Sequence, residues 1–322
     1  MLNIIVNPET GAGRGRQIFE KIRPLFDHTG VSYHVYYSGK GKRVEDIVAK
    51  LTSAGIQDKA EGADQDLNGL SDDRFADIVI VGGDGSMNGA VNGIRDFERT
   101  RLGFIPAGSG NDLARDMNLP GDMEELVKRI AKRKVTRRMD IGLAHMNDED
   151  RLFNISSGIG FDADTCYYVD RSRMKGFLNR IGCGKLVYIL TAIRLILRNK
   201  KFYCEIETAD GKKRVYPKCL FAVAMNHRYE GGGFMFAPNA EDTDSKLDFC
   251  VASGVGPLGF MFMFPFALFG KHIMFRRIDV FSAPEAIIRT DSVRHIHTDG
   301  DAPYNDDEIR VSIYKKKLNL FV

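Results

Sequence analysis

Short apolar runs alternate with longer amphipathic stretches in the first part of the chain. Between the runs, apolar residues recur at three- and four-residue spacing, as they do over 43–55, which is typical of helices packed on one face. Strands that alternate with helices form a mostly parallel sheet with helices on both faces. The pattern therefore predicts an α/β, doubly wound domain over residues 1–137. Its predicted strands lie at 2–6, 31–37, 77–81 and 102–105.

The pattern changes in the second part of the chain. Residues 201–225 alternate in polarity around Ala209–Lys212, as the two strands of a hairpin do. Helical patches at 160–172 and 185–197 interrupt the strand-like segments. We therefore predict a β-rich sandwich domain over 138–314. Its further strands are expected at 246–253, 276–283, 286–290, 294–298 and 308–314.

Composition limits the class of protein. The chain has 322 residues, of which 43% are hydrophobic and 28% charged, so it is globular rather than disordered. Its formal net charge of +3 is low for a nucleic-acid binder, and we expect no nucleic-acid partner. The five cysteines are scattered and form no Cys-X-X-Cys pair, which favours a reducing, cytoplasmic compartment. The first residues are typical of a strand rather than of a signal peptide.

One strongly apolar run covers residues 255–269. Pro257 and Pro265 interrupt it, and it is shorter than the ~20 residues that span a bilayer. Two interpretations stay open for this run: a buried helix or helix pair, or a surface that docks on a membrane. A basic run over 128–138 is either a solvated helix face or a contact with anionic lipid headgroups.

Three glycine-rich turns each follow a predicted strand. They read NPETGAGRG at 7–15, VGGDGSMNGAVNGI at 81–94 and PAGSGNDLAR at 106–115. Because the carboxyl ends of parallel strands meet at one edge of a sheet, we expect the three turns to converge. Glycine lets the backbone approach a ligand closely, and the N-termini of the following helices favour an anion. The turns therefore predict a polyphosphate site, although none of them is a Walker A loop.

The same turns carry a resemblance to a known family. GGDGSMNGAVNGI resembles the GGDGTxNEVVNGL signature of the diacylglycerol kinase catalytic domain family. The turns at 7–15 and 106–115 are similar to the family's NPxSGxGxG and PxGTxNDFAR loops. Residues 226–249 resemble its NxxxxGGGxxxxPxAxxxDGxLD stretch, and HTDGDAP at 297–303 takes the place of its DGE motif. The resemblance covers nearly the whole chain, with the motifs in the same order.

The resemblance implies a lipid kinase that transfers the γ-phosphoryl group of ATP to a lipid hydroxyl, with diacylglycerol as the first candidate substrate. It implies a nucleotide site in the first domain, a lipid-substrate domain over 138–314, and a chain end at 315–322 that returns to the first domain. Mg²⁺ is the expected cofactor and ATP the expected co-substrate. The lipid acceptor is expected at a membrane surface, reached by peripheral association, and a homodimer is left open.

Phosphoryl transfer requires groups that hold the phosphates, neutralise charge and accept a proton. For catalysis we choose Asp84, Asp112 and Asp301, with Asp301 as the general base and Asp84 as its rival. An Asp beside Gly also fits an ordinary turn or helix cap. The nucleotide-binding candidates are Asn7, Gly11, Gly13, Arg14, Arg16, Gly82, Gly83, Gly85, Ser86, Asn88, Gly108, Ser109 and Asn111. A structural Mg²⁺ or an ordinary acidic turn is expected at Asp242, Asp244 and the carbonyl of Leu247.

Three departures from the family pattern keep other functions open. Gly89 stands where the family has Glu, and the connection over 56–75 is longer than usual. Asp301 is one methylene shorter than the Glu that it replaces, which moves the carboxylate by about 1 Å. The alternatives are an NAD kinase-like enzyme and a non-catalytic regulator that binds lipid or nucleotide. The turn at 106–115 and the GGGFMFAP stretch favour the lipid kinase over the NAD kinase.

Overall fold

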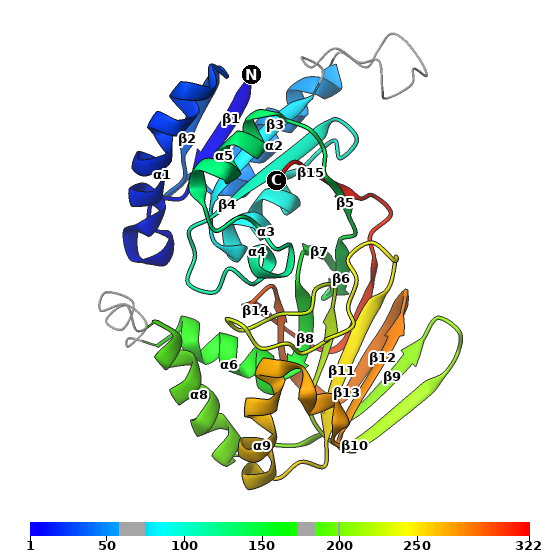
Figure 1. Ribbon diagram of the computed structural model, residues 1–322. Helices are drawn as coiled ribbons and strands as arrows, with labels where there is room; N and C mark the ends of the chain where they lie inside the picture. Colours follow the sequence, from blue (N-terminus) through cyan, green and yellow to red (C-terminus); the bar gives the residue numbers. More distant parts are fainter. Residues whose placement is uncertain (58–74, 173–183, 199) are drawn as a thin grey trace. The chain divides into compact units, whose positions relative to one another are not determined.

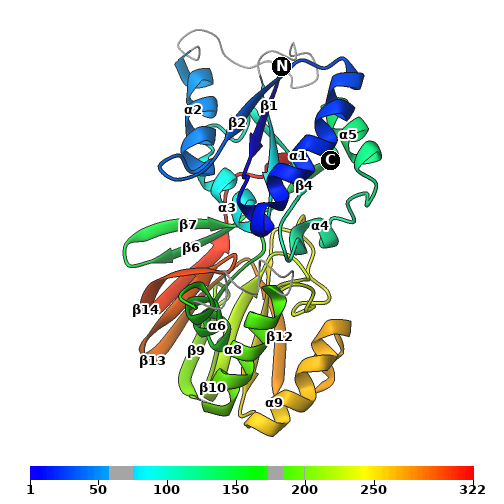
Figure 2. The same ribbon diagram turned by 90° about the vertical axis from the view of Figure 1, so that its left-hand side faces the viewer.

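The computed structural model describes residues 1–57, 75–172, 184–198 and 200–322. The chain divides into two compact units, Met1–Met139 with Lys316–Val322, and Asp140–Lys315 (Figure 1, Figure 2). Each unit has its own sheet and its own buried core. Most of the long connection predicted over 56–75 lies outside the described residues, which stop at Gln57 and resume at Phe75.

The first unit is built on a mostly parallel sheet, which confirms the predicted fold class. The strand order is β2-β1-β3-β4-β15-β5. Strand β15, at the end of the chain, pairs parallel with β4 and antiparallel with β5, so the chain end does return to this sheet. Strands β1, β3 and β4 are buried almost throughout, which explains their continuous apolar runs. The strands are β1 Leu2–Val6, β2 Tyr33–Tyr37, β3 Ala76–Gly82, β4 Thr100–Pro106, β5 Arg137–Met139 and β15 Leu318–Leu320.

Helices cover both faces of this sheet. The helices α1 and α5 pack together on one face, where Phe19, Ile22 and Leu126 share a core with alternate strand residues. The helices α2 and α3 pack against each other and against β3. This arrangement buries the sheet from both sides, as in other doubly wound domains. The helices are α1 Thr10–Thr29, α2 Val44–Gln57, α3 Asp84–Gly93, α4 Asp112–Asp116 and α5 Met123–Ala131.

The second unit is β-rich, as predicted. Its strands follow the order β12-β11-β10-β8-β13-β14-β6-β7, and β9 pairs with both β10 and β13. The short strands β6, β7 and β8 were not predicted from the pattern of the sequence. The strands are β6 Gly142–Met146, β7 Glu149–Phe153, β8 Ser156–Gly160, β9 Phe202–Thr208, β10 Lys213–Met225, β11 Leu247–Ser253, β12 Ile278–Ala283, β13 Glu285–Thr298 and β14 Asp301–Ile313.

Two long strands convert this sheet into a sandwich. Strand β10 pairs with β9 along its first part and with β8 and β11 along its last part, and its register shifts between Tyr216 and Cys219. Strand β13 likewise pairs first with β9 and then with β8, with a shift between Arg289 and Arg294. Such irregularities bend a strand, so each long strand passes from one layer to the other around an apolar core. The segments predicted as two strands, 286–290 and 294–298, are therefore the two halves of β13.

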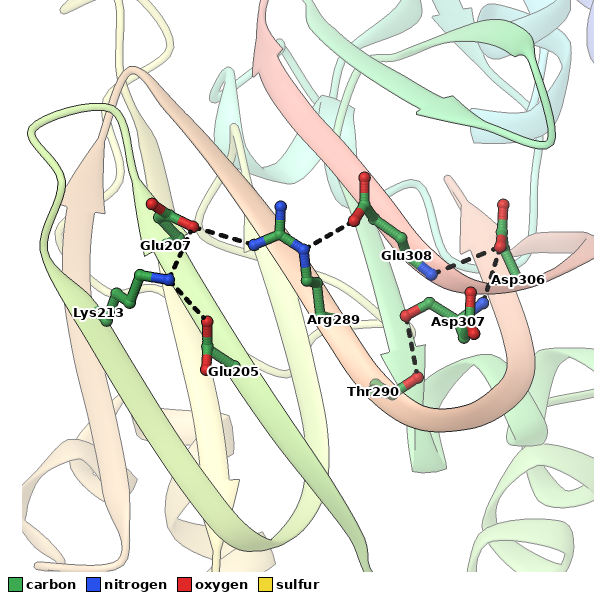
Figure 3. Close-up of polar contacts among 8 residues, drawn as sticks. All are labelled: Glu205, Glu207, Lys213, Arg289, Thr290, Asp306, Asp307 and Glu308. Atoms are coloured by element: carbon green, nitrogen blue, oxygen red, sulfur yellow. Dashed lines mark hydrogen bonds and ion pairs between the residues drawn. The ribbon is translucent and has the colours of Figure 1, made fainter.

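A row of alternating charges crosses four strands of this unit (Figure 3). Lys213 Nζ on β10 lies 3.2 Å from Glu205 Oε1 and 3.3 Å from Glu207 Oε2, both on β9. Arg289 on β13 pairs with Glu207 at 3.0 Å and with Glu308 on β14 at 2.7 Å. These residues are cross-strand neighbours, and opposite charges that face each other favour the observed register.

The apolar run at 255–269 is helical but only partly buried. Phe260, Met263 and Ala267 are buried, whereas Leu258 is 81% and Phe269 72% exposed, so the prediction of a buried helix or helix pair was wrong for much of the segment. Among the described residues, no helix is both long enough and apolar enough to cross a membrane. The helices of this unit are α6 Phe161–Asp170, α8 Gly184–Arg198, α9 Pro257–Met263 and the 3-10 helices η3 Phe264–Phe269 and η4 Lys271–Met274.

Candidate functional site

The three glycine-rich turns leave the first sheet at the carboxyl ends of β1, β3 and β4, which are neighbours in that sheet. Backbone hydrogen bonds continue past the strand ends. The N–H of Asn7 donates to the carbonyl of Val81 at 2.9 Å, and the N–H of Ala107 donates to that of Gly82 at 2.7 Å. The turns therefore begin side by side, at one edge of the sheet.

Side chains tie the three turns together. Asn7 Nδ2 donates to Ser86 Oγ at 2.9 Å, which joins the first turn to the second. Arg14 donates to the carbonyl of Gly108 at 2.7 Å and to Ser109 Oγ at 3.4 Å, which joins the first turn to the third. Five of the candidates named from the sequence thus belong to one connected group.

Packing requires glycine at some positions of these turns but not at others. A Cβ on Gly108 would lie 2.7 Å from Gly83 Cα, so the backbones of the second and third turns touch. A Cβ on Gly82 would lie 2.5 Å from Ser86 Oγ. Gly85 is different, because its backbone is helical and nothing lies within 4 Å of the position of its Cβ. Alanine would favour the helix there by about 1 kcal/mol, so packing does not explain the glycine at position 85.

The first turn has an unusual backbone. Gly11, Ala12 and Gly13 have φ values of 57°, 60° and 94°, all in the left-handed region, and the regular part of α1 follows them. Glycine adopts this conformation freely, but the exposed Ala12 is strained in it. Strained backbone of this kind is concentrated at binding sites. A Cβ on Gly11 would lie 2.7 Å from the carbonyl oxygen of Ala107, so this turn also contacts the third.

The two acidic candidates of this unit hold the start of α4. The carboxylate of Asp84 accepts the N–H of Asp112 at 3.1 Å and the N–H of Leu113 at 3.3 Å. Asp112 is buried, and its Oδ1 lies 2.5 Å from Arg115 Nη1. Carboxylates that accept N–H groups at a helix start stabilise that helix. Asp84 therefore has a positioning role, whatever else it does.

The remaining candidates of this unit are less closely joined. Arg16 is exposed on α1. Asn88 is buried in α3, where its Oδ1 accepts from Asn92 at 3.2 Å. Asn111 donates to the carbonyl of Gly108 at 3.1 Å, and its buried Oδ1 has no hydrogen-bond partner among the described residues.

Gly89 lies on the side of α3 that faces α2. A Cβ at this position would lie 3.7 Å from both the backbone nitrogen of Glu45 and the Cβ of Val44, which is ordinary contact distance. Packing against α2 therefore does not require glycine. The effect of this departure from the family pattern is to remove one carboxylate from α3.

In the second unit, Asp301 is the exposed first residue of β14. It follows a two-residue turn in which Asp299 and Gly300 have φ values of 50° and 82°, as in a type I′ hairpin. Asp299 anchors this turn, because its carboxylate accepts the N–H of Asn154 at 2.8 Å and that of Ile155 at 2.7 Å. Asp299 is not among the residues predicted for the site, since the pattern Asp-Gly-Asp does not show which carboxylate turns inward.

A buried His297 precedes the same turn and lies between two carboxylates. Its Nε2 is 3.0 Å from Asp162 Oδ2 and 3.5 Å from Glu230 Oε1. Burial lowers the pKa of the His297 ring, but Glu230 and Asp162 raise it more, to about 9. The N–H of Gly300 lies 3.3 Å from Nδ1 and favours the neutral ring, but two carboxylates outweigh one long contact. No spacing along the chain indicates this group, because Asp162 and His297 are 135 positions apart.

The residues expected to bind a structural metal ion have other contacts. Asp242 is buried, with its Oδ2 at 3.7 Å from His227 Nε2. Asp244 is exposed, and its Oδ1 accepts the N–H of Lys246 at 3.0 Å. Leu247 is the first residue of β11. No group of three or more His, Cys, Asp or Glu side chains in the described ranges is placed to hold a metal ion, and this Mg²⁺ site stays a prediction.

A cavity of about 170 Å³ lies in the second unit, beside α6 and the β13–β14 pair. Apolar and aromatic side chains form part of its wall, and basic side chains form another part. Asp164 adds a carboxylate to the wall, and burial raises its pKa. The apolar part includes Phe161, Tyr168 and Leu220, and the basic part includes Arg198, Arg294 and His295.

A doubly wound domain that gathers three glycine-rich turns, followed by a β-sandwich domain, defines a two-domain kinase. Residues 1–144 match the diacylglycerol kinase catalytic domain, and residues 155–321 match the YegS C-terminal NAD kinase beta sandwich-like domain. The chain therefore belongs to the diacylglycerol kinase family of lipid kinases, as its motifs implied.

Individual relatives agree with this assignment. The Bacillus subtilis protein named "Putative lipid kinase YtlR" is 25% identical over 305 residues, which cover 92% of each chain. The crystal structure of a diacylglycerol kinase from Bacillus anthracis covers 99% of this chain and 96% of its own, with a TM-score of 0.67 and 20% identity. An NAD kinase from Archaeoglobus fulgidus, solved in complex with ATP, covers 100% of this chain and 94% of its own at a TM-score of 0.51 and 13% identity. The last two show the fold alone, and the NAD kinase is the weaker likeness.

Proposed function

We propose that this kinase transfers the γ-phosphoryl group of ATP to a lipid hydroxyl, with diacylglycerol, which gives phosphatidic acid, as the first substrate to test. The observation that carries the proposal is the contact of three glycine-rich turns at one sheet edge, where the backbones of Gly83 and Gly108 touch. Main-chain N–H groups of such turns bind phosphate oxygens, and the N-terminus of α3 favours their charge. Arg14 brings a guanidinium group to the same edge.

The proposed roles follow from the contacts of each residue. Gly85 leaves space for a phosphate where packing does not require glycine. The carboxylates of Asp84 and Asp112 are oxygen ligands of the kind that Mg²⁺ prefers, and hydrogen bonds already fix their orientation, so we assign them to hold the ion through its water shell. When bound, Mg²⁺ neutralises charge on the phosphates.

We assign the general base to Asp301. Its carboxylate accepts the proton of the lipid hydroxyl while that oxygen bonds to the γ-phosphorus and ADP leaves. The exposed position of Asp301 after an anchored turn supports this role. We assign acceptor binding to the second unit, whose cavity adjoins the β13–β14 pair, and we place the protein in the cytoplasm at a membrane surface.

The test incubates the protein with radiolabelled ATP and either mixed micelles of diacylglycerol or NAD. We expect label in phosphatidic acid, whereas label in NADP alone refutes the lipid acceptor in favour of the NAD kinase-like alternative. Asp301→Asn should lower kcat about 100-fold or more, with little change in KM for ATP. The matched control is Asp307→Asn, an exposed carboxylate on the same strand, which should leave kcat unchanged. Nucleotide binding without phosphoryl transfer to any acceptor would support the non-catalytic regulator instead.

A further inference from the structure

The second unit has a large exposed apolar surface. We call it the apolar face and define it by Leu190 and Leu197 on α8, Leu258 and Phe262 on α9, Phe269 on η3 and Met274 on η4. These six side chains are between 46% and 81% exposed. In the described part of the chain, ten of the sixteen exposed large hydrophobic side chains lie on these four helices. Exposed apolar side chains gathered in this way mark an interaction surface.

The helices that carry the apolar face are packed on one side and open on the other. Phe260, Met263 and Ala267 are buried, while Leu258 and Phe269 on the same segment are mostly exposed. Helices α8 and α9 contact each other and lie side by side in both views (Figure 1, Figure 2). The core of the second unit is therefore complete without these side chains, and they are available to another molecule.

The segments that carry the apolar face are basic. Residues 190–198 and 254–277 contain five Lys or Arg and no Asp or Glu, although 43 of the 322 residues of the chain are acidic. Lys271 and Arg276, beside Met274, are both exposed. A surface that combines apolar side chains with cations complements a bilayer with anionic headgroups. A symmetric contact with a second copy would instead bring like charges together.

We propose that the apolar face docks on a lipid bilayer that contains anionic lipids. The exposed side chains enter the boundary between headgroups and acyl chains, and the surrounding Lys and Arg side chains contact the headgroups. The purpose of this docking surface rests on the proposed function, because a kinase with a bilayer-embedded acceptor must reach that bilayer. The binding itself is measured without activity.

The experiment is co-sedimentation with vesicles of phosphatidylcholine alone, or of phosphatidylcholine with an equal share of phosphatidylglycerol. We expect wild type to bind the anionic vesicles. Leu258→Ser with Phe269→Ser should weaken this binding about tenfold or more. The matched control, Tyr203→Ser with Val215→Ser, removes exposed apolar groups elsewhere and should change binding less than about twofold. Equal binding by the wild type and the first double variant overturns the proposal.

Two further measurements separate the remaining explanations. Lys271→Gln with Arg276→Gln should lower binding to the anionic vesicles and leave weak binding to phosphatidylcholine unchanged. If the wild type is a dimer, and Leu258→Ser with Phe269→Ser makes it a monomer without weakening vesicle binding, the face is a subunit interface and the proposal is overturned. Activity on a short-chain diacylglycerol in solution tests the proposed function alone: without it the proposed acceptor fails, while vesicle binding by the apolar face would still stand.

Discussion

Replacing Asp84 by Asn separates a positioning role from a purely metal-binding role. In the structure, one carboxylate oxygen accepts the N–H of Asp112 and the other accepts the N–H of Leu113. The amide of Asn keeps one acceptor and turns its NH₂ group toward the second N–H. One hydrogen bond to a charged group becomes a neutral one, and the other is replaced by two opposed donors. Because Asp84 is only half-buried, each change costs about 1–2 kcal/mol, and we expect Asp84→Asn to lose about 2–4 kcal/mol of unfolding free energy.

The assay is urea unfolding of the full chain, followed together with ATP binding and kcat. Because Asp84 holds the start of α4 and the end of the third turn, we expect the loss of stability and weaker ATP binding to occur together. The matched control is Asp122→Asn at the start of α5, where the carboxylate accepts a single N–H from Glu124 at 3.0 Å. Asn is as good as Asp at such a position, so this control should change stability by less than about 0.5 kcal/mol. A loss of kcat with unchanged stability would refute the positioning role and leave Asp84 as a metal-binding residue alone.

Three further predictions test other parts of the structure. Gly85→Ala should raise KM for ATP about tenfold while leaving stability equal or up to ~1 kcal/mol higher, because only a ligand needs that space; unchanged kinetics would remove Gly85 from the phosphate site. Arg289→Met should lower the unfolding free energy by about 1 kcal/mol at low salt and by clearly less in concentrated NaCl, because Arg289 joins two carboxylates but is itself 40% exposed. An equal loss at both salt concentrations would count against an electrostatic origin. His297 has a folded pKa of about 9, above the usual 6.5, so the stabilisation that its charged ring provides is present at pH 6 and decreases as the pH rises toward 9. The unfolding free energy should therefore fall between pH 6 and 8, and urea unfolding should show a smaller fall for Asp162→Asn than for the wild type.

The parallel core of the first unit was predictable because its determinants are local. A buried strand of a doubly wound sheet requires a continuous apolar run, and the turn after it requires glycine where backbones touch, as at Gly83 and Gly108. Both requirements appear directly in the order of residues. The distinction between Gly82, which packing explains, and Gly85, which it does not, depends on distances to atoms elsewhere in the fold and could not be predicted.

Other features depend on contacts that are distant in sequence. The break predicted within β13 follows from the polar residues near Asp291, yet β13 continues through them with a register shift, because both of its halves have partner strands. The buried group of Asp162, Glu230 and His297 comes from three separate segments, so no spacing along the chain indicates it. The exposure of Leu258 and Phe269 was also not predictable, since an apolar run has the same pattern whether a core or a membrane covers it.

The anchored hairpin turn bears directly on the shortened side chain at position 301. Asp299 fixes the turn to the backbone of β8 and the residues before it, through the N–H groups of Asn154, Ile155 and Ser156. A turn held at three points has little freedom to move its neighbour toward a substrate. The carboxylate of Asp301 therefore reaches about 1 Å less far than that of a Glu on the same backbone. That distance must be made up by the position of the acceptor or by a shift of the second unit as a whole. For this reason we expect the acceptor preference of this chain, rather than its hold on the nucleotide, to differ from that of family members with Glu at this position.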